Sequence, residues 1–385
     1  MNKRKVCVVI TARPSYSRVK TAMQAIKNHS DLELQLILSG SVLLERYGDA
    51  SKVIESDGFI VNEKIYNIIE GETPTSMAKT TGIAIMELAN AFYNLKPDIV
   101  ITIADRFETI ATSIAASYQN IPLVHIQGGE VTGSIDEKVR HANTKFADIH
   151  FVASENARNR VIQMGEEEST VINTGCPSID IARDTLEKPE LNFDPIKKYG
   201  GVGAESNWLK GYVVVMQHSV TTEYESAKDQ IYETLEAVHE LDIPAFWFWP
   251  NVDAGSDGIS NGIRKFRERN NLKNIHFFKN MVPEDFLRLI KNSKCLIGNS
   301  SVGIREAAFL GVPVVNIGSR QNSRERANNV IDCDYQKKEI KESTRRQFKH
   351  GHYECSLIYG DGYSGKNIAN FLTKCELRFN KKITY

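Results

Sequence analysis

The stretch HIQGGEVTGSIDEKVRH, residues 125–141, places side chains that can carry protons beside a pair of glycines. Glu130 and Asp136 supply carboxylates, and Gln127 stands directly before Gly128–Gly129. Adjacent glycines let the backbone come close to a ligand, whereas a purely structural loop has little use for so many ionisable groups. We therefore predict acid–base chemistry here, at the end of the strand expected from the preceding apolar run PLVHI.

Ser134 and Glu137 have the spacing of a capping box, in which the two residues satisfy backbone N–H groups at a helix start. The pattern predicts a helix that begins at Ile135, and it explains Glu137 structurally. The buried stripe of this helix is expected to hold four apolar residues: Ile135, Val139, Ala142 and Phe146. An adjacent face, expected to look toward the ligand, holds Asp136, Arg140 and Asn143.

A third carboxylate, Asp105, follows the apolar run DIVITI and precedes Arg106. Its alternative role is to cap the next helix. The carboxyl ends of parallel strands meet at one edge of a sheet, so Asp105, Glu130 and Asp136 can converge there from separate loops. Carboxylates crowded in a partly dry site push their pKa values upward and apart, which suits one acid and one base at neutral pH.

A possible phosphate site lies in KCLIGNSSVGIREAAFLGVPVVNIG, residues 294–318, which reads as strand, turn, helix and strand. The helix is expected to begin near 299–301 and to end at Gly311, just before Pro313. Its start would present free N–H groups and the positive end of the helix dipole, which together favour an anion.

Four residues near that helix start would support a nucleotide. Ser300 and Ser301 offer hydroxyls, Gly303 would allow close approach, and Glu306 can accept two hydrogen bonds from a ribose diol. The alternative is an ordinary serine cap without a ligand.

Further candidates stand where other predicted strands end. Arg13 and Ser17 lie between the first strand and the first helix, and Arg320 follows a late strand. His218 and Asn251 follow two strands of the second half. Arg13 suits a bidentate phosphate clamp, with a surface ion pair as the alternative.

Elements able to position these residues alternate along the chain. Apolar runs predict strands at VCVVI, LQLIL, DIVITI, PLVHI, IHFVA, TVINTG, YVVVM, PAFWFW, NIHFF, KCLIG and PVVNI. Amphipathic segments lie between them, so we predict parallel sheets covered by helices on both faces. One polar stretch, residues 184–212, interrupts the alternation. The fold class is therefore α/β, with two doubly wound, Rossmann-like domains facing a cleft.

Composition excludes several classes of protein. The 385 residues suffice for two domains, and 48 basic against 48 acidic residues give no net charge, which argues against a nucleic-acid or membrane surface. The first apolar run is too short for a signal peptide, and no segment approaches a membrane span. The six cysteines are scattered without a CxxC pair. They predict reduced thiols in a cytoplasmic protein, without disulfides or a zinc site.

The pattern GxGxxG occurs at Gly360, Gly362 and Gly365. A dinucleotide site would need a preceding strand and a following βαβ unit, and the remaining chain has room for one helix. We expect a turn that leads into that helix. The P-loop pattern GxxxxGK[ST] is absent from the sequence.

Eight motifs occur in the order found in the hydrolysing UDP-N-acetylglucosamine 2-epimerases, a family that includes enzymes of sialic and legionaminic acid synthesis. They are ADRFET, HIQGGEVTGSIDEKVRH, GCPSID, MQHSVTTEYE, PNVDAGS, GNSSVGIRE, PVVNIGSRQNSR and YGDG. The resemblance spans nearly the whole chain. It implies a glycosyltransferase-B-like fold, with residues 1–180 completed by a helix at about 364–385, and a nucleotide-binding domain at 208–360.

The resemblance also implies a reaction. UDP leaves by anti elimination after loss of the C2 proton, water adds to the 2-acetamidoglycal, and the C2-inverted sugar is released. The resemblance implies neither a metal nor a nicotinamide cofactor in catalysis, and we expect a homodimer or a homotetramer. The family's nucleotide-binding residues match Arg13, Ser17, Arg106, His218, Asn251, Ser300, Ser301, Glu306 and Arg320. Its acidic residues match Asp105 and Asp136.

Gln127 departs from the glutamate of the mammalian motif HIEGGE, and an amide cannot act as a general acid or base. Proton transfer is then expected from Glu130, Asp136 or Asp105, with Gln127 orienting the sugar. Ile103 replaces a polar residue of the mammalian enzyme and makes the pocket more apolar. Both changes affect the expected sugar more than UDP, so UDP- or GDP-linked diacetylbacillosamine is an alternative substrate to UDP-N-acetylglucosamine. A glycosyltransferase and an inactive nucleotide-sugar sensor are the alternatives of other classes.

Overall fold

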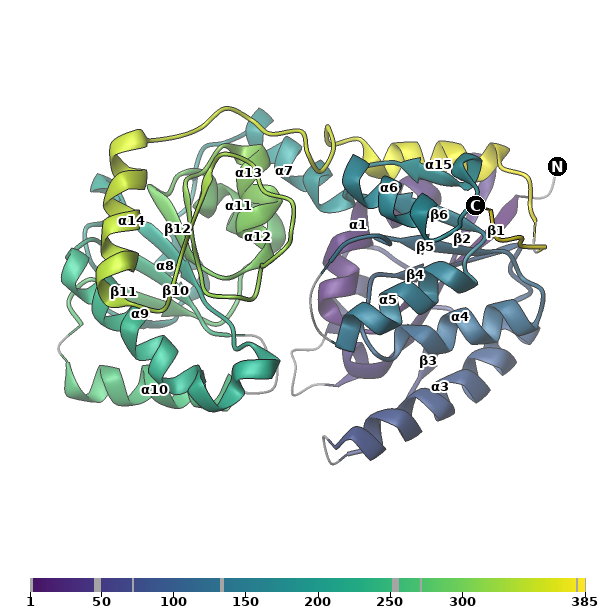
Figure 1. Ribbon diagram of the computed structural model, residues 1–385, viewed down its shortest axis with the longest axis horizontal. Coiled ribbons are helices and arrows are strands. Elements are labelled where there is room, and N and C mark those ends of the chain that lie inside the picture. Colours follow the sequence, from purple (N-terminus) through teal and green to yellow (C-terminus); the bar gives the residue numbers. More distant parts are fainter. Residues whose placement is uncertain are drawn as a thin grey trace. The chain divides into compact units, whose positions relative to one another are not determined.

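The computed structural model describes residues 3–44, 50–70, 73–131, 135–250, 256–270, 272–378 and 380–384. The chain divides into two compact units (Figure 1): Met1–Asp180 with Tyr359–Tyr385, and Ile181–Ile358. Each unit contains its own sheet, and the two sheets share no strand.

The first unit is a parallel sheet of strand order β3-β2-β1-β4-β5-β6-β7. Its strands are β1 (Arg4–Ile10), β2 (Leu32–Ser39), β3 (Glu63–Ile65), β4 (Ile99–Ile103), β5 (Leu123–Ile126), β6 (Ile149–Val152) and β7 (Val171–Asn173). Its helices are α1 (Arg13–Asn28), α2 (Ala50–Ser56), α3 (Pro74–Leu95), α4 (Thr109–Tyr118), α5 (Ile135–Phe146), α6 (Glu155–Gln163) and α15 (Ser364–Lys374). Helix α7 (Pro177–Glu187) begins in this unit and continues into the second, and the 3₁₀ turns are η1 (Gly40–Leu43) and η3 (Glu168–Thr170).

Strand β1 shows why both faces of this sheet are apolar. Val6, Val8 and Ile10 point into a core shared with α1 and α15, whereas Cys7 and Val9 point into a core shared with α3 and α4. Successive side chains of a strand face opposite sides, so a strand covered on both faces is apolar throughout. Figure 1 shows α15 in yellow against the purple and blue elements of this unit, which places residues far apart in the sequence in one core.

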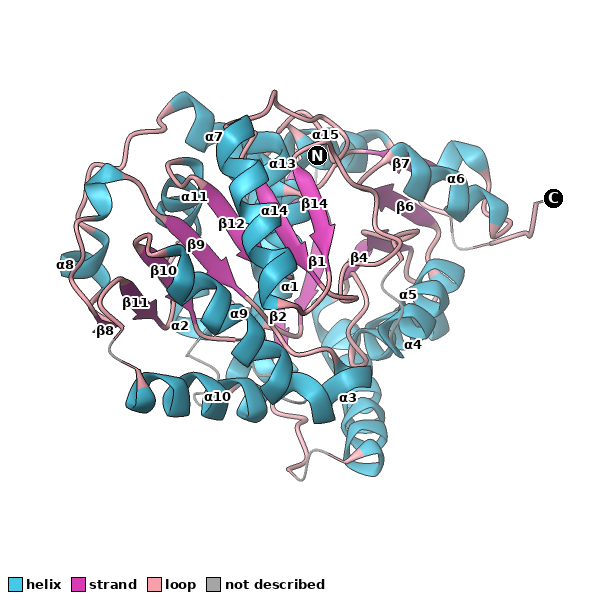
Figure 2. Ribbon diagram, turned by 60° about the vertical axis from the view of Figure 1, so that its left-hand side comes forward, coloured by secondary structure: helices cyan, strands magenta, loops and turns pink. Residues whose placement is uncertain are grey.

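The second unit has the strand order β14-β13-β12-β9-β10-β11-β8, and β8 runs antiparallel to β11. Its strands are β8 (Val202–Gly203), β9 (Val213–Met216), β10 (Ala245–Phe248), β11 (Ile275–Phe278), β12 (Cys295–Gly298), β13 (Val314–Ile317) and β14 (Val330–Cys333). Its helices are α8 (Pro195–Tyr199), α9 (Ala227–Leu241), α10 (Ser256–Arg269), α11 (Pro283–Lys291), α12 (Ser301–Ile304), α13 (Glu306–Leu310) and α14 (Lys337–His350), with 3₁₀ turns η4 (Trp208–Lys210) and η5 (Thr221–Ser226). Helices flank these strands as well (Figure 2).

The predicted α/β class and all eleven predicted strands are confirmed. Three strands were not predicted: β3, β8 and β14. Each is a sheet edge of two to four residues, with polar or partly exposed side chains in place of an apolar run. Strand β8 and helix α8 also show that part of the polar stretch 184–212 folds into the second unit.

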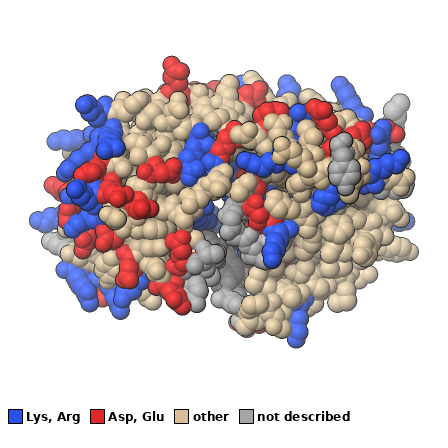
Figure 3. Space-filling view, in the orientation of Figure 1, with Lys and Arg blue, Asp and Glu red and all other residues tan. Residues whose placement is uncertain are grey.

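The surface charges and the lengths of the helices agree with the expectations from composition. On the face shown in Figure 3, Lys and Arg are intermixed with Asp and Glu over the second unit, and uncharged residues prevail near α3 and α4. No helix among the described residues is long and apolar enough to span a bilayer.

The GxGxxG glycines serve chain packing. Gly360 and Gly362 adopt positive φ in the turn before α15, as expected for a turn leading into a helix. A Cβ on Gly365, in the first turn of α15, would lie 2.7 Å from the backbone carbon and oxygen of Thr21 in α1. This glycine therefore permits the close contact of the two helices.

We expect Gly365→Ala to destabilise the protein by about 1–3 kcal/mol, because the added methyl group meets backbone that cannot move away cheaply. Gly82→Ala is the matched control: Gly82 lies inside α3, and a Cβ there meets nothing within 4 Å. Alanine should stabilise that exposed helix position by up to about 1 kcal/mol. Urea unfolding of both variants measures the difference, and equal stabilities would contradict the packing role of Gly365.

Candidate active site

The predicted catalytic residues of the first unit follow β4 and β5 at the carboxyl edge of the sheet. Ala104 (φ 60°) and Gln127 (φ 68°), each directly after its strand, adopt the left-handed conformation without being glycine. Such backbone strain concentrates at functional sites because the surrounding structure has to enforce it. Asp105 and Glu130 follow these turns, and both are buried.

Arg140 of α5 connects these two turns. The whole residue is 1% exposed; Nη1 donates to the carbonyl of Glu130 at 2.6 Å, and Nη2 donates to the carboxylate of Asp105. Arg18 Nη1 of α1 lies 3.9 Å from the other oxygen of Asp105. Two cations therefore face Asp105, which fits an electrostatic role. The alternative role as helix cap does not apply, because α4 begins at Thr109 with Glu108 as its N-cap residue.

A second group of polar residues on α5 fixes the strained turn at Ala104. Asn143 Nδ2 donates to Thr109 Oγ1 at 2.8 Å and lies 3.4 Å from the carbonyl of Ala104, while Ser113 Oγ donates to Asn143 Oδ1 at 2.7 Å. His125 Nε2 also donates to the Ala104 carbonyl, at 2.9 Å. These hydrogen bonds thereby hold the end of β4, helix α4 and helix α5 together.

His125 is neutral in this position. Burial lowers its pKa to about 3, against a weaker opposing effect from its hydrogen bond to Ala104. Because a carbonyl can only accept, the ring proton is on Nε2, and Nδ1 faces Thr144 Oγ1 at 3.1 Å. We infer that His125 supports the backbone and carries no proton in a reaction at neutral pH.

The predicted start of α5 at Ile135 is confirmed, but its predicted buried stripe is wrong. Val139, Ala142 and Phe146 are only partly buried, whereas Arg140 and Asn143, expected to face the ligand, are fully buried. The polar residues point inward because the strand ends opposite them offer carbonyls and a carboxylate as partners. The capping residue Ser134 lies outside the described residues.

Three residues of the loop and first turn have different surroundings. Glu130 is 7% exposed, and Asp136 is half-buried in the first turn of α5. Gln127 is buried: its Nε2 donates to Cys176 Sγ at 3.0 Å, and its Oε1 has no hydrogen-bond partner among the described residues. Glu137 lies 3.2 Å from His141 Nε2 along the helix, consistent with a structural role.

The predicted nucleotide-binding residues of this unit lie on α1 and after β4. Arg13 is exposed as the first residue of α1, and Ser17 Oγ donates to the carbonyl of Pro14 at 3.0 Å. Arg106 Nε donates to the buried Glu108 Oε1 at 3.0 Å. Of the three, Arg13 is the most accessible to a ligand.

In the second unit, Asn299 joins the carboxyl ends of β9 and β12. Its Oδ1 accepts from the His218 backbone N–H at 2.7 Å, and its Nδ2 donates to the His218 carbonyl at 2.8 Å. Arg320 Nη1 (3.1 Å) and Gln321 Nε2 (2.8 Å) donate to the Asn299 carbonyl. The structure thus brings His218, Ser300 and Arg320 together around a residue that we did not predict. A polar residue directly after a buried strand was the available signal.

His218 is also neutral: burial, together with the positive charge of Arg320, lowers its pKa to about 3. It is therefore suited to donate or accept a hydrogen bond and does not add positive charge to a phosphate site. Asn251, predicted to act with it, lies outside the described residues.

The prediction of a single helix after Asn299 is wrong. It is divided into α12 and α13 at Arg305, whose φ/ψ values are −105° and −76°. Few aligned peptides give a small dipole, so phosphate attraction at this site depends on individual N–H groups and side chains. Ser300 is the N-cap and accepts from the Val302 N–H at 3.4 Å. The predicted end is confirmed, with Gly311 in the left-handed conformation.

Gly303 also has a role different from the predicted one. It is buried, and a Cβ there would lie 2.9 Å from Val314 Cγ1 of β13. The close approach is thus that of the sheet, and no ligand is needed to explain it. Ser301 and Glu306 are half-buried near the start of each short helix.

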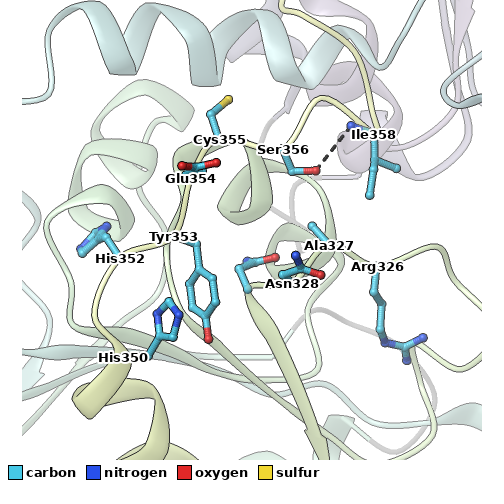
Figure 4. A pocket seen from close by; sticks show the side chains of 11 residues that line it. Arg326, Ala327, Asn328, His350, His352, Tyr353, Glu354, Cys355, Ser356 and Ile358 are labelled. Carbon is cyan, nitrogen blue, oxygen red and sulfur yellow. Dashed lines mark hydrogen bonds between the residues drawn. The ribbon is translucent and has the colours of Figure 1, made fainter.

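A pocket of about 530 Å³ lies elsewhere in the second unit (Figure 4). Its lining includes Asn329, Tyr353 and Ser356 but none of the predicted site residues. Asn329 directly precedes β14, so the pocket lies at the amino edge of the sheet. Ligands of such sheets bind at the carboxyl edge. The described residues contain no group of three His, Cys, Asp or Glu side chains placed to hold a metal ion.

The neutral state of His218 has a measurable consequence. Its folded pKa of about 3 lies below the ordinary 6.5, so the unfolded chain binds a proton first as the pH falls. The free energy of unfolding should then decrease by about 1.4 kcal/mol per pH unit between those values. We expect His218→Gln to reduce this slope in urea unfolding below about pH 6. An unchanged slope, or a ring that titrates near neutrality by NMR, would contradict this assignment.

Known proteins resemble this chain along most of its length. Residues 24–373 match the family model described as UDP-N-acetylglucosamine 2-epimerase. A "UDP-N,N'-diacetylbacillosamine 2-epimerase (hydrolyzing)" of Legionella pneumophila is 32% identical over 96% of this chain and 95% of its own. A "UDP-N-acetylglucosamine 2-epimerase" of Neisseria meningitidis serogroup B is 31% identical over 96% and 94%.

Solved structures agree on the fold. The structure of a UDP-GlcNAc 2-epimerase from Neisseria meningitidis, bound to UDP-GlcNAc, superimposes with a TM-score of 0.78 at 21% identity, covering 96% of this chain and 100% of that one. A Staphylococcus aureus structure with UDP also gives 0.78, at 18% identity, covering 99% and 100%. Given the family match over residues 24–373, the chain belongs to the UDP-N-acetylglucosamine 2-epimerase family.

Proposed function

We propose that this protein is a hydrolysing 2-epimerase of a UDP-linked 2-acetamido sugar. In its simplest form the reaction converts UDP-N-acetylglucosamine and water into N-acetylmannosamine and UDP. The observation that carries the proposal is the arrangement around Arg140, which joins Asp105 and the Glu130 loop at one sheet edge. It holds the Asp105 carboxylate beside a positive charge and fixes the loop that carries the Glu130 carboxyl group, and preorganised charges of this kind stabilise charge that develops in a reaction.

The reaction divides into two balanced steps. A base removes the C2 proton, its electron pair forms the C1=C2 bond, and the C1–oxygen bond to UDP breaks on the opposite face. Water then adds its oxygen to C1 of the 2-acetamidoglycal, while C2 receives a proton from the face opposite the original one. The free sugar therefore has inverted configuration at C2.

Glu130 and Asp136 are the proposed proton carriers. Glu130 is buried at the end of β5, and Asp136 lies on the helix that Arg140 anchors. Burial favours the neutral form of a carboxyl group, so one buried and one half-buried carboxyl group suit acid and base roles. Asp105, paired with two arginines, is assigned to electrostatic stabilisation, and Gln127 to orientation of the sugar.

The nucleotide is assigned to the remaining predicted residues. In the second unit, Ser300, Ser301, Arg320 and neutral His218 provide hydrogen bonds for phosphate and uracil groups, and Glu306 for the ribose. Asn251 of this unit is assigned to the same ligand. Arg13, Ser17 and Arg106 of the first unit are assigned to the diphosphate.

A second sugar is supported by a specific finding. Relatives of nearly equal identity are named for different substrates, diacetylbacillosamine in Legionella pneumophila and N-acetylglucosamine in Neisseria meningitidis. A Campylobacter jejuni relative, 32% identical over 87% of this chain, is named for both the GDP- and UDP-linked form of the former. UDP- or GDP-linked diacetylbacillosamine is therefore the alternative substrate.

We expect the protein to release the nucleotide and a C2-inverted sugar from one member of a panel of UDP- and GDP-linked 2-acetamido sugars, without an acceptor. In deuterated water, one deuterium should appear at C2 of the product because that proton is removed and replaced. Proton NMR follows both changes. A product without deuterium at C2 would contradict elimination, and an intact donor that requires an acceptor would indicate a transferase.

Glu130→Gln and Asp136→Asn should each reduce kcat by about 10²–10⁴, as expected for loss of a general acid or base, while UDP affinity changes little. Glu87→Gln is the control, because that carboxylate is exposed on α3 and has no proposed role in proton transfer. Gln127→Glu should remain folded and at least partly active. Normal turnover by both the Glu130 and Asp136 variants would refute the assignment.

A further inference from the structure

A buried charge cluster centred on Glu166 lies at the end of α5 opposite to its catalytic first turn. The Glu166 side chain is 2% exposed, and it accepts hydrogen bonds from Lys145 Nζ at 2.6 Å, His150 Nε2 at 3.1 Å and Lys381 Nζ at 2.5 Å. Burial alone would raise the pKa of Glu166, but these three donors outweigh it and lower the pKa to about 2. The carboxylate is thus charged at neutral pH and binds the ammonium groups of two lysines.

Lys381 belongs to the extended segment that follows α15, yet it caps α5. Its Nζ also lies within hydrogen-bond distance of the carbonyls of Thr144 (3.0 Å), Lys145 (2.9 Å) and Ala147 (2.7 Å), so its three N–H groups are shared among four acceptors. The last carbonyls of a helix have no partner within it and carry the negative end of its dipole. One ammonium group therefore satisfies the end of α5 and fixes it to Glu166.

The same segment is held at a second point. The Thr384 backbone N–H donates to the carbonyl of Gly165 at 3.0 Å, one residue from Glu166. Gly165 has a positive φ of 87°, which strains any other residue, and a Cβ there would lie 3.2 Å from both Ile383 Cγ2 and the Thr384 carbonyl oxygen. Lys381 is consequently presented to α5 from a segment fixed on both sides of the cluster.

Helix α5 connects this cluster to the proposed reaction site. Arg140 and Asn143, one and two turns from Asp136, hold Asp105, the Glu130 carbonyl and the strained Ala104 turn. Asp136 lies about 15 Å along the helix axis from Phe146, at 1.5 Å per residue. Because a helix moves as a rigid rod, a shift of its capped end changes the position of Arg140 and Asp136.

We propose that Lys381 is a positioning residue for the epimerase reaction, acting through α5. The inference rests on the proposed function and extends it to a segment far from the reacting groups in sequence. A small displacement of catalytic groups is enough to reduce a rate by orders of magnitude while substrate contacts elsewhere persist. Lys381 should therefore affect turnover more than nucleotide binding.

The test compares Lys381→Met with Lys382→Met, which removes the same charge from the exposed neighbouring residue. We expect Lys381→Met to reduce kcat about 10-fold or more, with KM and UDP affinity within about twofold of wild type. Lys382→Met should behave as wild type. Assays are made well below the melting temperature of each variant, so that a loss of stability alone does not change kcat. The proposal would be overturned if Lys381→Met and Lys382→Met had equal kcat values, or if Lys381→Met had a raised KM and the kcat of the wild type.

A second readout does not depend on turnover. Hydrogen–deuterium exchange should increase in residues 128–146 of Lys381→Met and remain unchanged in Lys382→Met. Unchanged exchange there would overturn the proposal, whereas absence of turnover in the wild type would refute only the proposed function. If Lys381→Met does not fold, Lys381→Gln and Lys382→Gln are compared by the same criteria.

Discussion

The burial of one guanidinium group determines the organisation of the first unit's candidate site. Arg140 is almost fully enclosed, and a charge in that position is tolerated only where counter-charges and acceptors surround it. Asp105 and the Glu130 carbonyl meet this requirement, which ties the ends of β4 and β5 to α5. The loop and the helix that hold the proposed proton carriers are thus positioned by this guanidinium group.

The second unit organises its sheet edge by neutral groups. Asn299 bridges β9 and β12 through an amide that pairs with both backbone groups of His218, and the histidine is uncharged because it is buried. Such a site discriminates by hydrogen-bond geometry, with Arg320 as its nearby cation. These directional neutral contacts suit the base or the ribose that our proposal assigns to this unit.

Gln127 stands at the position where we propose a contact that orients the sugar. It is buried in a strained turn, and its amide N–H binds the thiol of Cys176. A carboxylate there would need a different partner in the same enclosed space, since a buried charge without compensation is costly. The amide therefore fits the observed surroundings, and our proposal accordingly assigns proton transfer to the carboxylates of the same loop and of α5.

The sequence alone determined the α/β class, the central strands and the strand ends that carry the candidate residues. Apolar runs such as VCVVI and KCLIG specify buried parallel strands, because no other element hides so many consecutive apolar side chains in so short a segment. The sequence also predicted the start of α5 at Ile135 and the presence of polar residues along this helix. The motifs within these loops were sufficient to indicate the family, which the match over residues 24–373 confirms.

Only the tertiary structure decided which polar residues turn inward. Arg140, Asn143 and Asn299 look like surface or cap residues in sequence. They are buried because their partners come from the turns after strands, 10 to 81 residues away, or from neighbouring helices. The break at Arg305 and the packing of Gly303 against Val314 were likewise invisible to local patterns. Lys381 lies more than 230 residues from the helix end that it caps. Sequence periodicity reflects a residue's neighbours along the chain. These contacts depend instead on which strands and helices lie side by side in the folded sheet.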